Sequence, residues 1–411
     1  MLAELPDDRV VVTALRIQQS DWLRHGDVWR QFCTANPRQA LQAIRAAEGD
    51  DRWRSEVISP LLEVARETDD AELQAGITDL VADLPTDRVI DVAAAAAWWL
   101  WERAKRSAQP VGEGILRAWD HLAQVVYASA NSDALQVAGM TVDAAIASPG
   151  GTLAIGLGAL MNKRAWPADG GFEEPFLTRL DIVAASHSLA GLQGRMILVR
   201  DLALLEAIDP GWVSRHLTPR LHWPHAEASP LWRALAGRRI GRPSLFAPLI
   251  DDFLEAVRRA GPSENITGLA CNLFQVSRWA IDQSSSVSAS MLPKVRAALA
   301  AALPKVRERT AWVLWVRVAG QKGETVNHAE RWRAEVGPVF HHIWPLDAAA
   351  RDPNTSRNLV FMALESGDAF PDAVEAIRLV VVPYDVVTIA GWLQGQPSKR
   401  PRPPIHVRSC G

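Results

Sequence analysis

The distribution of tryptophan constrains this chain more than any other feature of its sequence. The 411 residues include 17 tryptophans but only 2 tyrosines. From Trp22 to Trp392, the indoles recur at or near the ends of apolar helical runs, often before a proline or a charged residue. Because each buried indole removes about 150–250 Å² of surface from water, this pattern predicts helices locked side by side by tryptophan.

Apolar residues recur with helical spacing in several segments, whereas strand-like alternation is almost absent. One apolar stripe lies within residues 73–84. It follows the segment 69–72, Asp-Asp-Ala-Glu, which we interpret as an N-cap with an acid three residues on, and it stops before Pro85. Similar stripes lie within residues 58–65 and 246–257. Short polar or Pro/Gly joints separate the stripes, which favours antiparallel hairpins stacked in chain order. The sequence therefore predicts an all-α fold of stacked helical hairpins, a HEAT-like or solenoid-like array.

Two internal similarities support a repeated architecture. Residues 292–296 and 303–307 both read Leu-Pro-Lys-Val-Arg, and residues 212–224 resemble residues 332–345 in the spacing of Trp, Pro and His. A compact, non-repeating helical bundle is the alternative. We expect N-terminal helical repeats over residues 1–147, a C-terminal helical domain over 148–393, and a disordered Pro/Arg-rich tail over 394–411.

The composition narrows the class of protein. With 48% hydrophobic and 22% charged residues the chain is globular, and its net charge of -3 provides no global basic field for nucleic acid. The longest apolar run, residues 92–101, is about half of the ~20 residues that a membrane-spanning helix needs. No signal peptide is visible at the N-terminus, and the three cysteines are widely spaced. We therefore expect a cytoplasmic protein that makes no membrane contact.

The catalytic and ligand-binding motifs that this sequence partly matches are incomplete. His222, His341 and His342 could form a site in the concave face of the array, but no helical Glu-x-x-His partner accompanies them. The glycine-rich segment 148–158 lacks the Gly-Lys-Ser/Thr of a phosphate loop. We interpret residues 148–151 as a joint before a helix, and Gly156 and Gly158 as allowing close helix approach. We predict no catalytic residue, no metal ligand and no cofactor.

Two groups of residues are candidates for contact with a partner. In the run from Trp98 to Trp101, Trp98 and Trp101 share one helical face while Trp99 lies off it. Arg103, Lys105 and Arg106 follow, and tryptophan and arginine dominate interface hot spots. The second group lies at two expected hairpin corners, at His222, Trp223, His341, His342 and Trp344. Burial of these rings between helices is the structural alternative.

The second half of the chain resembles an uncharacterised helical domain found C-terminal to sirtuin-like domains in bacterial anti-phage defence proteins. The motifs that carry the resemblance are residues 150–152, 176–180, 200–202, 209–212, 217–223, 331–333, 339–345 and 368–374. The resemblance covers roughly residues 148–387, and residues 32–41 and 51–53 look like the helical repeats that precede this domain.

The resemblance implies a defence protein in which a sirtuin-like module hydrolyses NAD⁺ and the helical part senses or regulates. This chain carries neither the nucleotide loop nor the catalytic motifs of a sirtuin, so the hydrolase activity is not transferred to it. We expect a non-enzymatic scaffold, standalone or truncated, that contacts a sirtuin-like effector or a phage protein. An unrecognised enzyme with a histidine site and a nucleic-acid sensor that uses Arg103, Lys105 and Arg106 are the alternatives.

Overall fold

The structure is a computed structural model of the chain. It describes residues 2–20, 27–106, 112–128, 137, 139–238, 240–261, 265–282, 285–320, 324 and 326–384. These residues form helices and no β-strand, which confirms the predicted all-α fold. Trp22, Trp392 and the expected tail at 394–411 lie outside the described residues. No described helix combines the length and the apolar character needed to cross a bilayer.

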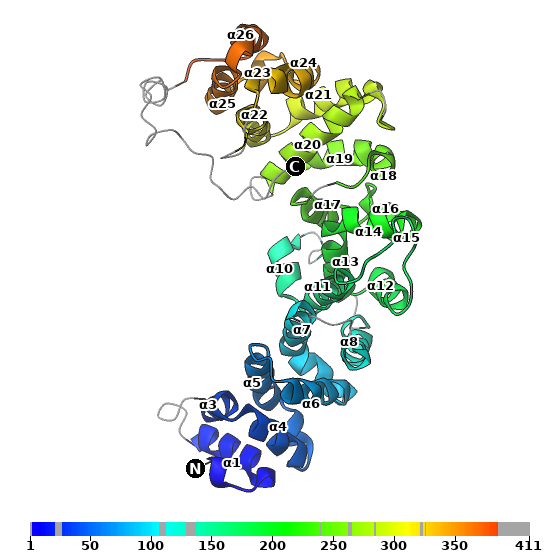
Figure 1. The fold of residues 1–411 in the computed structure, drawn as a ribbon, viewed down its shortest axis with the longest axis vertical. Coiled ribbons are helices and arrows are strands. Elements are labelled where there is room, and N and C mark those ends of the chain that lie inside the picture. The colour runs from blue at the N-terminus through cyan, green and yellow to red at the C-terminus, as the bar shows by residue number, and fades with distance from the viewer. Residues whose placement is uncertain are drawn as a thin grey trace. The chain divides into compact units, whose positions relative to one another are not determined.

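The chain divides into two compact units. The first comprises the residues up to Asp201 together with Ile208–Leu217, and the second comprises Leu202–Ala207 together with the residues from Thr218 onwards. The domain boundary expected after residue 147 lies inside the first unit. Figure 1 colours the helices of both units in chain order.

In the first unit, most helices pack against the helix two places along the chain. Its helices are α1 (Asp7–Ser20), α3 (Val28–Ala35), α4 (Pro37–Ala46), α5 (Ser55–Ala65), α6 (Ala71–Ala82), α7 (Val89–Arg106), α8 (Glu113–Val126), α10 (Val142–Ala147), α11 (Pro149–Met161), α12 (Phe176–Ala185), α13 (Leu189–Arg200) and α15 (Pro210–His216). Helix α3 contacts α5, α5 contacts α7, α6 contacts α8, and α11 packs against both α7 and α13. This pattern is that of stacked hairpins.

In the second unit, helices pack against the helix two or three places along the chain. Its helices are α14 (Leu202–Ile208, whose last residue belongs to the first unit), α16 (Thr218–Leu221), α17 (Ala228–Ala236), α18 (Pro243–Phe246), α19 (Ile250–Arg259), α20 (Ile266–Ile281), α21 (Leu292–Ala301), α22 (Pro304–Ala319), α23 (His328–Arg331), α24 (Gly337–Ile343), α25 (Pro353–Leu364) and α26 (Phe370–Ile377). Helix α19 contacts α21, α20 contacts α22, α21 contacts α24, and α22 contacts α25.

Shorter turns of helix fill several of the joints. They are Leu2–Glu4, Asp50–Trp53, Thr86–Arg88, Ala247–Leu249, Ala289–Met291, Ala348–Ala350 and Gly367–Ala369, together with the π-helical turn Trp332–Val336. Residues 381–384, which lie within the β-branched sequence 379–387, have no regular structure.

The segment 69–72, predicted to cap a helix, contains the N-cap of α6. Helix α6 begins after Asp70, whose carboxylate accepts hydrogen bonds from the backbone N–H groups of Glu72 and Leu73 at 3.1 and 3.2 Å. This N-cap satisfies donors that have no partner within the helix. The apolar stripe that follows is buried, from Leu73 to Val81. The apolar side chains of α5, and those of α18 and α19 within residues 246–257, are also buried.

The indoles join helices through both packing and hydrogen bonds. None of the described tryptophans is exposed, and Trp29, Trp99 and Trp212 are fully buried. In the first unit the indole N–H of Trp29 donates to the carbonyl of Val57 at 2.8 Å, which links α3 to α5. Equivalent bonds in the two units run from Trp119 to Leu153, from Trp212 to Asp181 and from Trp232 to Leu221. Tryptophan side chains therefore join neighbouring helices in the core, as the sequence predicts.

One joint differs from the sequence prediction. Residues 148–151 do not form a loop, because Ser148 is the N-cap of α11 and the helix starts at Pro149. A Cβ at Gly150 would lie 2.5 Å from the carbonyl oxygen of Ala190, and one at Gly151 only 1.8 Å from that of Ala145. A Cβ at Gly156 or Gly158 would meet only ordinary contacts. The glycines that permit close approach are therefore the first pair of α11.

Candidate interaction surfaces

The three tryptophans of helix α7 lie on two different faces, as the helical spacing predicts. Trp99 is fully buried, and its indole N–H donates a 2.9 Å hydrogen bond to Oε1 of Gln74. Trp98 and Trp101 are half-buried on another face, with ring centroids 4.7 Å apart and planes tilted by 54°. The contact between these two rings fixes their orientations and leaves part of each ring accessible.

Basic side chains adjoin this pair of indoles at the C-terminal end of α7. The ammonium of Lys105 lies 5.7 Å from the centroid of the Trp101 ring, within range of a cation–π interaction. The guanidinium of Arg103 lies 3.7 Å from the carboxylate of Asp69, and that of Arg106 donates to the carbonyl of Glu67 at 3.0 Å. We call Trp98, Trp101, Arg103, Lys105 and Arg106 the α7 surface.

A lysine in the turn after α11 adds to this concentration of positive charge. The ammonium of Lys163 donates to the backbone carbonyl of Lys105 at 3.1 Å. Burial lowers the pKa of Lys163, and the nearby charge of Arg103 lowers it further. The carboxylate of Glu102 lies 3.5 Å from Lys105 and 3.7 Å from Arg106. The α7 surface is therefore aromatic and basic, with acidic groups interspersed.

His222 and Trp223 form a tightly bonded corner in the second unit. The carboxylate of Asp252 on α19 accepts hydrogen bonds from the ring of His222 at 2.7 Å and from the backbone N–H of Trp223 at 2.8 Å. The indole N–H of Trp223 donates to the backbone carbonyl of Asp252 at 3.0 Å. The guanidinium of Arg259 lies 4.3 Å from the centroid of the indole. Through these bonds, His222 and Trp223 fix the segment that follows α16 against α19.

His341, His342 and Trp344 lie on and just after α24. Trp344 is buried and stacks on Phe340, with ring centroids 5.3 Å apart. His341 and His342 are exposed, and Nδ1 of His342 is 2.7 Å from the carbonyl of Pro338. In the part of the chain that the structure describes, no three His, Cys, Asp or Glu residues form a group that could hold a metal ion. The structure therefore does not assemble His222, His341 and His342 into one such group.

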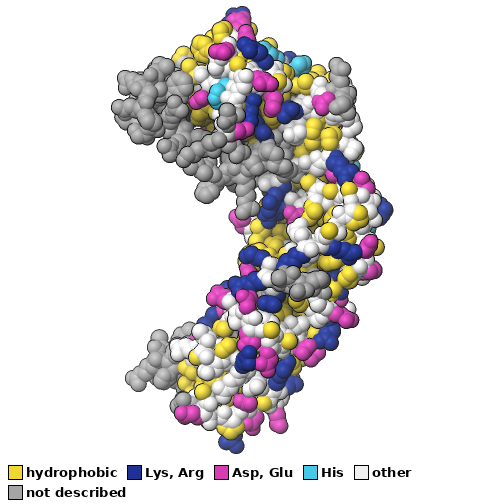
Figure 2. Space-filling model, in the orientation of Figure 1, with side chains coloured by type: hydrophobic (Ala, Val, Ile, Leu, Met, Phe, Trp, Pro, Cys, Tyr) yellow, Lys and Arg dark blue, Asp and Glu magenta, His cyan; other side chains and the backbone are white. Residues whose placement is uncertain are grey.

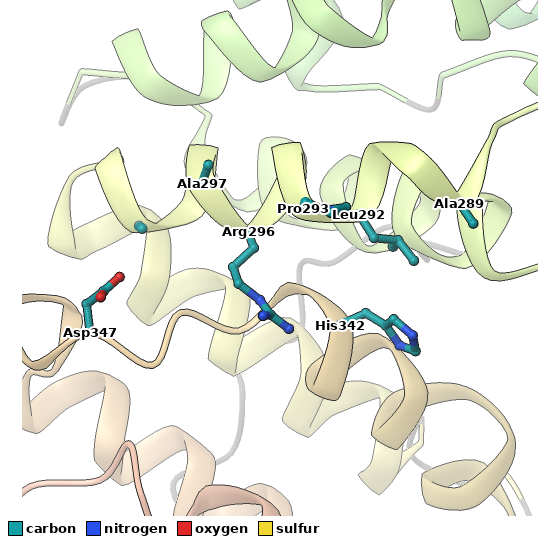
Figure 3. A pocket seen from close by; sticks show the side chains of 8 residues that line it. Ala289, Leu292, Pro293, Arg296, Ala297, His342 and Asp347 are labelled. Carbon is teal, nitrogen blue, oxygen red and sulfur yellow. The ribbon is translucent and has the colours of Figure 1, made fainter.

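A groove between α21 and α24 was not among the candidates from the sequence. One cavity of about 490 Å³ is lined by Ala289, Leu292, Pro293, Arg296, Ala297, Ala300, His342 and Asp347. A second cavity of about 370 Å³ shares three of these residues, Ala289, Leu292 and His342, and is otherwise lined by Ala280, Ile281, Asp282, Ser285, Val287 and Ser288. In Figure 3, Arg296 reaches from α21 towards α24, with His342 on one side and Asp347 on the other. The only signal in the sequence was the repeated Leu-Pro-Lys-Val-Arg motif that contains Arg296.

Charges of both signs are mixed over the face of the molecule shown in Figure 2. Lys and Arg side chains alternate with Asp and Glu over most of that face, without a continuous basic stripe. Non-specific binding to nucleic acid depends on several phosphate contacts from Lys and Arg. The face shown in Figure 2 therefore offers no continuous series of such contacts.

Comparison with known proteins yields one distant similarity. The chain is 23% identical over 418 residues to the uncharacterised protein y4cA of Sinorhizobium fredii (strain NBRC 101917 / NGR234). The alignment covers 94% of this chain but 32% of that protein, so the chain spans about a third of its length. No family model matches the chain, and no solved structure matches it.

Proposed function

We propose that this chain is a helical scaffold that senses or regulates by protein–protein contact within a bacterial anti-phage defence system. Its partner is a sirtuin-like effector that cleaves NAD⁺. The α7 surface is the observation that supports contact with a protein. The assignment to defence rests on the sequence resemblance described above.

The α7 surface has the chemistry of an interface hot spot. Tryptophan and arginine carry a large share of the binding energy in protein interfaces, and hot spots tend to lie in well-packed, desolvated positions. Trp98 and Trp101 already hold each other in place, so little side-chain freedom is lost when a partner covers them. Lys105 and Arg106 would orient an acidic partner segment beside the indoles.

The proposal is tested by measuring binding between the purified chain and a sirtuin-like NAD⁺ hydrolase encoded in the same genome. We expect Trp101→Ala to weaken this binding by about thirtyfold or more, since a hot-spot truncation costs at least ~2 kcal/mol. Trp53→Ala is the matched control, because Trp53 is also half-buried and has the guanidinium of Arg52 at 4.7 Å. It should leave the affinity unchanged.

A second measurement addresses regulation. The rate of NAD⁺ loss by the hydrolase is followed with and without the chain, and we expect the chain to change this rate and Trp101→Ala to abolish the change. Absence of binding, or a rate that the chain does not alter, contradicts the proposal. So does NAD⁺ hydrolysis by the purified chain without any partner.

A further inference from the structure

The outward face of α7 carries an acid, an indole and a base in a symmetric order. Asp91 and Lys105 lie seven residues before and after Trp98, so each is about 10 Å from it along the helix axis. Seven residues are close to two helical turns, which places all three side chains on the same side of α7. In the structure Asp91 and Lys105 are exposed and Trp98 is half-buried.

Both charges are available to another chain. Asp91 makes no ion pair with any residue in the described ranges. Lys105 lies 3.5 Å from the carboxylate of Glu102, but its side chain is 61% exposed. Exposed pairs of this kind contribute about 0–1 kcal/mol, so Lys105 can turn to a second carboxylate at little cost. The helix dipole favours acids at the start of a helix and bases at its end, but it does not account for the apolar side chains between them.

The face between the two charges is apolar. Ile90 is 53% exposed, and Ala94, one turn later, is exposed as well. Trp98 and Trp101 follow, with ring centroids 4.7 Å apart. The other sides of α7 pack against α5, α8 and α11. The outward face therefore offers aliphatic side chains on its N-terminal half and indoles on its C-terminal half, which is typical of a surface that another chain covers.

This order of side chains is complementary to itself when two copies of α7 lie antiparallel. A two-fold axis at Trp98 brings Asp91 opposite the partner's Lys105, and the symmetry forms the same pair a second time. The small side chain of Ala94 then lies opposite the partner's Trp101, where it leaves room for the indole. Ile90 lies beside Ala94 on the same edge of the face.

Charge also selects this arrangement over others. In a parallel pair, Asp91 would face Asp91 and Lys105 would face Lys105, and like charges in an interface are unfavourable. A wholly acidic or wholly basic partner segment would satisfy one end of the face and be repelled by the other. A second copy in antiparallel orientation satisfies both ends.

We propose that α7 is a self-association face, through which two copies of this chain pair in antiparallel orientation about a two-fold axis near Trp98. The inference goes beyond the proposed function and concerns the chain alone. Because a second copy covers the indoles that the proposed function assigns to the effector, the two partners compete for α7. An interface centred on one helix of 18 residues is small, which suits a dimer that dissociates readily.

The test is sedimentation equilibrium of the purified full chain, from about 2 to 200 μM protein at about 50 mM salt, where screening is weak. We expect a monomer–dimer equilibrium with a dissociation constant of about 1–50 μM, which should rise as salt is added. Asp91→Lys and Lys105→Glu should each weaken association at least about tenfold, because like charges then face each other twice in every dimer.

The decisive measurement mixes these two variants in equal amounts. In the mixed dimer each introduced charge faces an opposite charge, so both pairs are restored. We expect the mixture to associate within about threefold of the wild type, although each variant alone does not. Strong association of the wild type and of the mixture, with weak association of each variant alone, is expected only if Asp91 pairs with the partner's Lys105.

Two further variants separate this face from general effects. Glu113→Lys is the matched control for Asp91→Lys, because Glu113 is also exposed, lies in the first turn of α8 and undergoes the same change of charge. It should associate like the wild type. Trp98→Ala should weaken association at least about tenfold. Thermal unfolding of each variant verifies that it is folded.

Three outcomes overturn the inference: a chain that stays monomeric up to about 200 μM, charge variants that associate like the wild type, or a mixture that associates no better than its components. If the chain stays monomeric while Trp101→Ala weakens effector binding, the self-association is wrong and the proposed function stands. If the mixed variants restore a dimer while no effector binds, the self-association stands and the proposed function is wrong.

Discussion

The indole N–H of Trp99 donates a 2.9 Å hydrogen bond to Oε1 of Gln74 inside the first unit. The amide nitrogen of Gln74 in turn donates to the carbonyls of Ala65 and Thr68, at 2.5 and 2.9 Å, where α5 ends. Both side chains are buried. One network of buried hydrogen bonds therefore joins α5, α6 and α7, and the helix that carries the α7 surface is held in place through it.

Trp99→Phe should destabilise the first unit by about 1–3 kcal/mol, because it leaves Oε1 of Gln74 buried without a donor. Trp98→Phe, on the half-buried face, should cost less than about 1 kcal/mol. Urea unfolding followed by circular dichroism measures both changes. Equal losses for the two variants would show that the hydrogen bond to Gln74 contributes nothing specific.

The adjacent acids Asp251 and Asp252 should differ strongly when each is replaced by alanine. Asp252→Ala removes the acceptor for His222 and Trp223 and should cost about 1–3 kcal/mol. Asp251→Ala breaks only an exposed 2.8 Å ion pair with Lys294 and should change stability by less than about 1 kcal/mol. The unfolding midpoint of the second unit is the measurement. The reverse order of effects would contradict the corner described above.

Two glycines of α11 should respond in opposite directions to substitution by alanine. A Cβ at Gly151 would lie 1.8 Å from the carbonyl oxygen of Ala145, so Gly151→Ala must shift backbone and should cost about 1–3 kcal/mol. Gly158→Ala meets only an atom of Asp201 at 3.6 Å and should stabilise the helix by about 0.5–1 kcal/mol. Thermal unfolding of both variants tests this, and stabilisation by Gly151→Ala would show that α10 and α11 do not approach so closely.

Acid should remove a contribution that Asp70 makes to stability. The guanidinium of Arg38, which bonds both carboxylate oxygens of Asp70 at 2.6 and 2.8 Å, lowers the pKa of Asp70, and the N-cap bond from Leu73 lowers it further. Because the folded-state pKa lies below the unfolded value, the contribution is present above pH ~4 and is lost as the pH falls through the folded-state pKa. Unfolding midpoints between pH 7 and pH 2 should therefore fall less in Asp70→Asn than in the wild type. Parallel curves would contradict this.

The helical periodicity was sufficient to predict the fold class and several individual helices. The stripe after Asp70 and the stripe within 246–257 are buried because a period of 3.6 residues places their apolar side chains on one face, whichever neighbour covers it. Capping by Asp70 is equally local, since the acceptor and its donors are within three residues. Such features depend on nearby residues alone and can be recognised in a sequence.

The candidate sites were predicted less completely. Helical spacing predicts that Trp98 and Trp101 share one face of their helix and that Trp99 lies off it, and the structure confirms this. The bonding of His222 and Trp223 to Asp252 depends on α19, 29 and 30 residues away in the chain. The position of Gly150 inside a helix, against Ala190 of α13, likewise requires knowing which helices meet.

The sequence by itself determined that this chain forms helices, where many of them begin, and which faces they bury, because these properties follow from local spacing and capping. Only the tertiary structure decided what each buried polar group meets, since pairs such as Trp99 with Gln74 form between helices whose relative positions no local pattern specifies. The contrast between Arg296 and Arg307 shows the difference most clearly. The arginine of the same five-residue motif bonds the carbonyls at the end of α21 in one copy and the carbonyl of His341 on α24 in the other, because the surrounding helices differ.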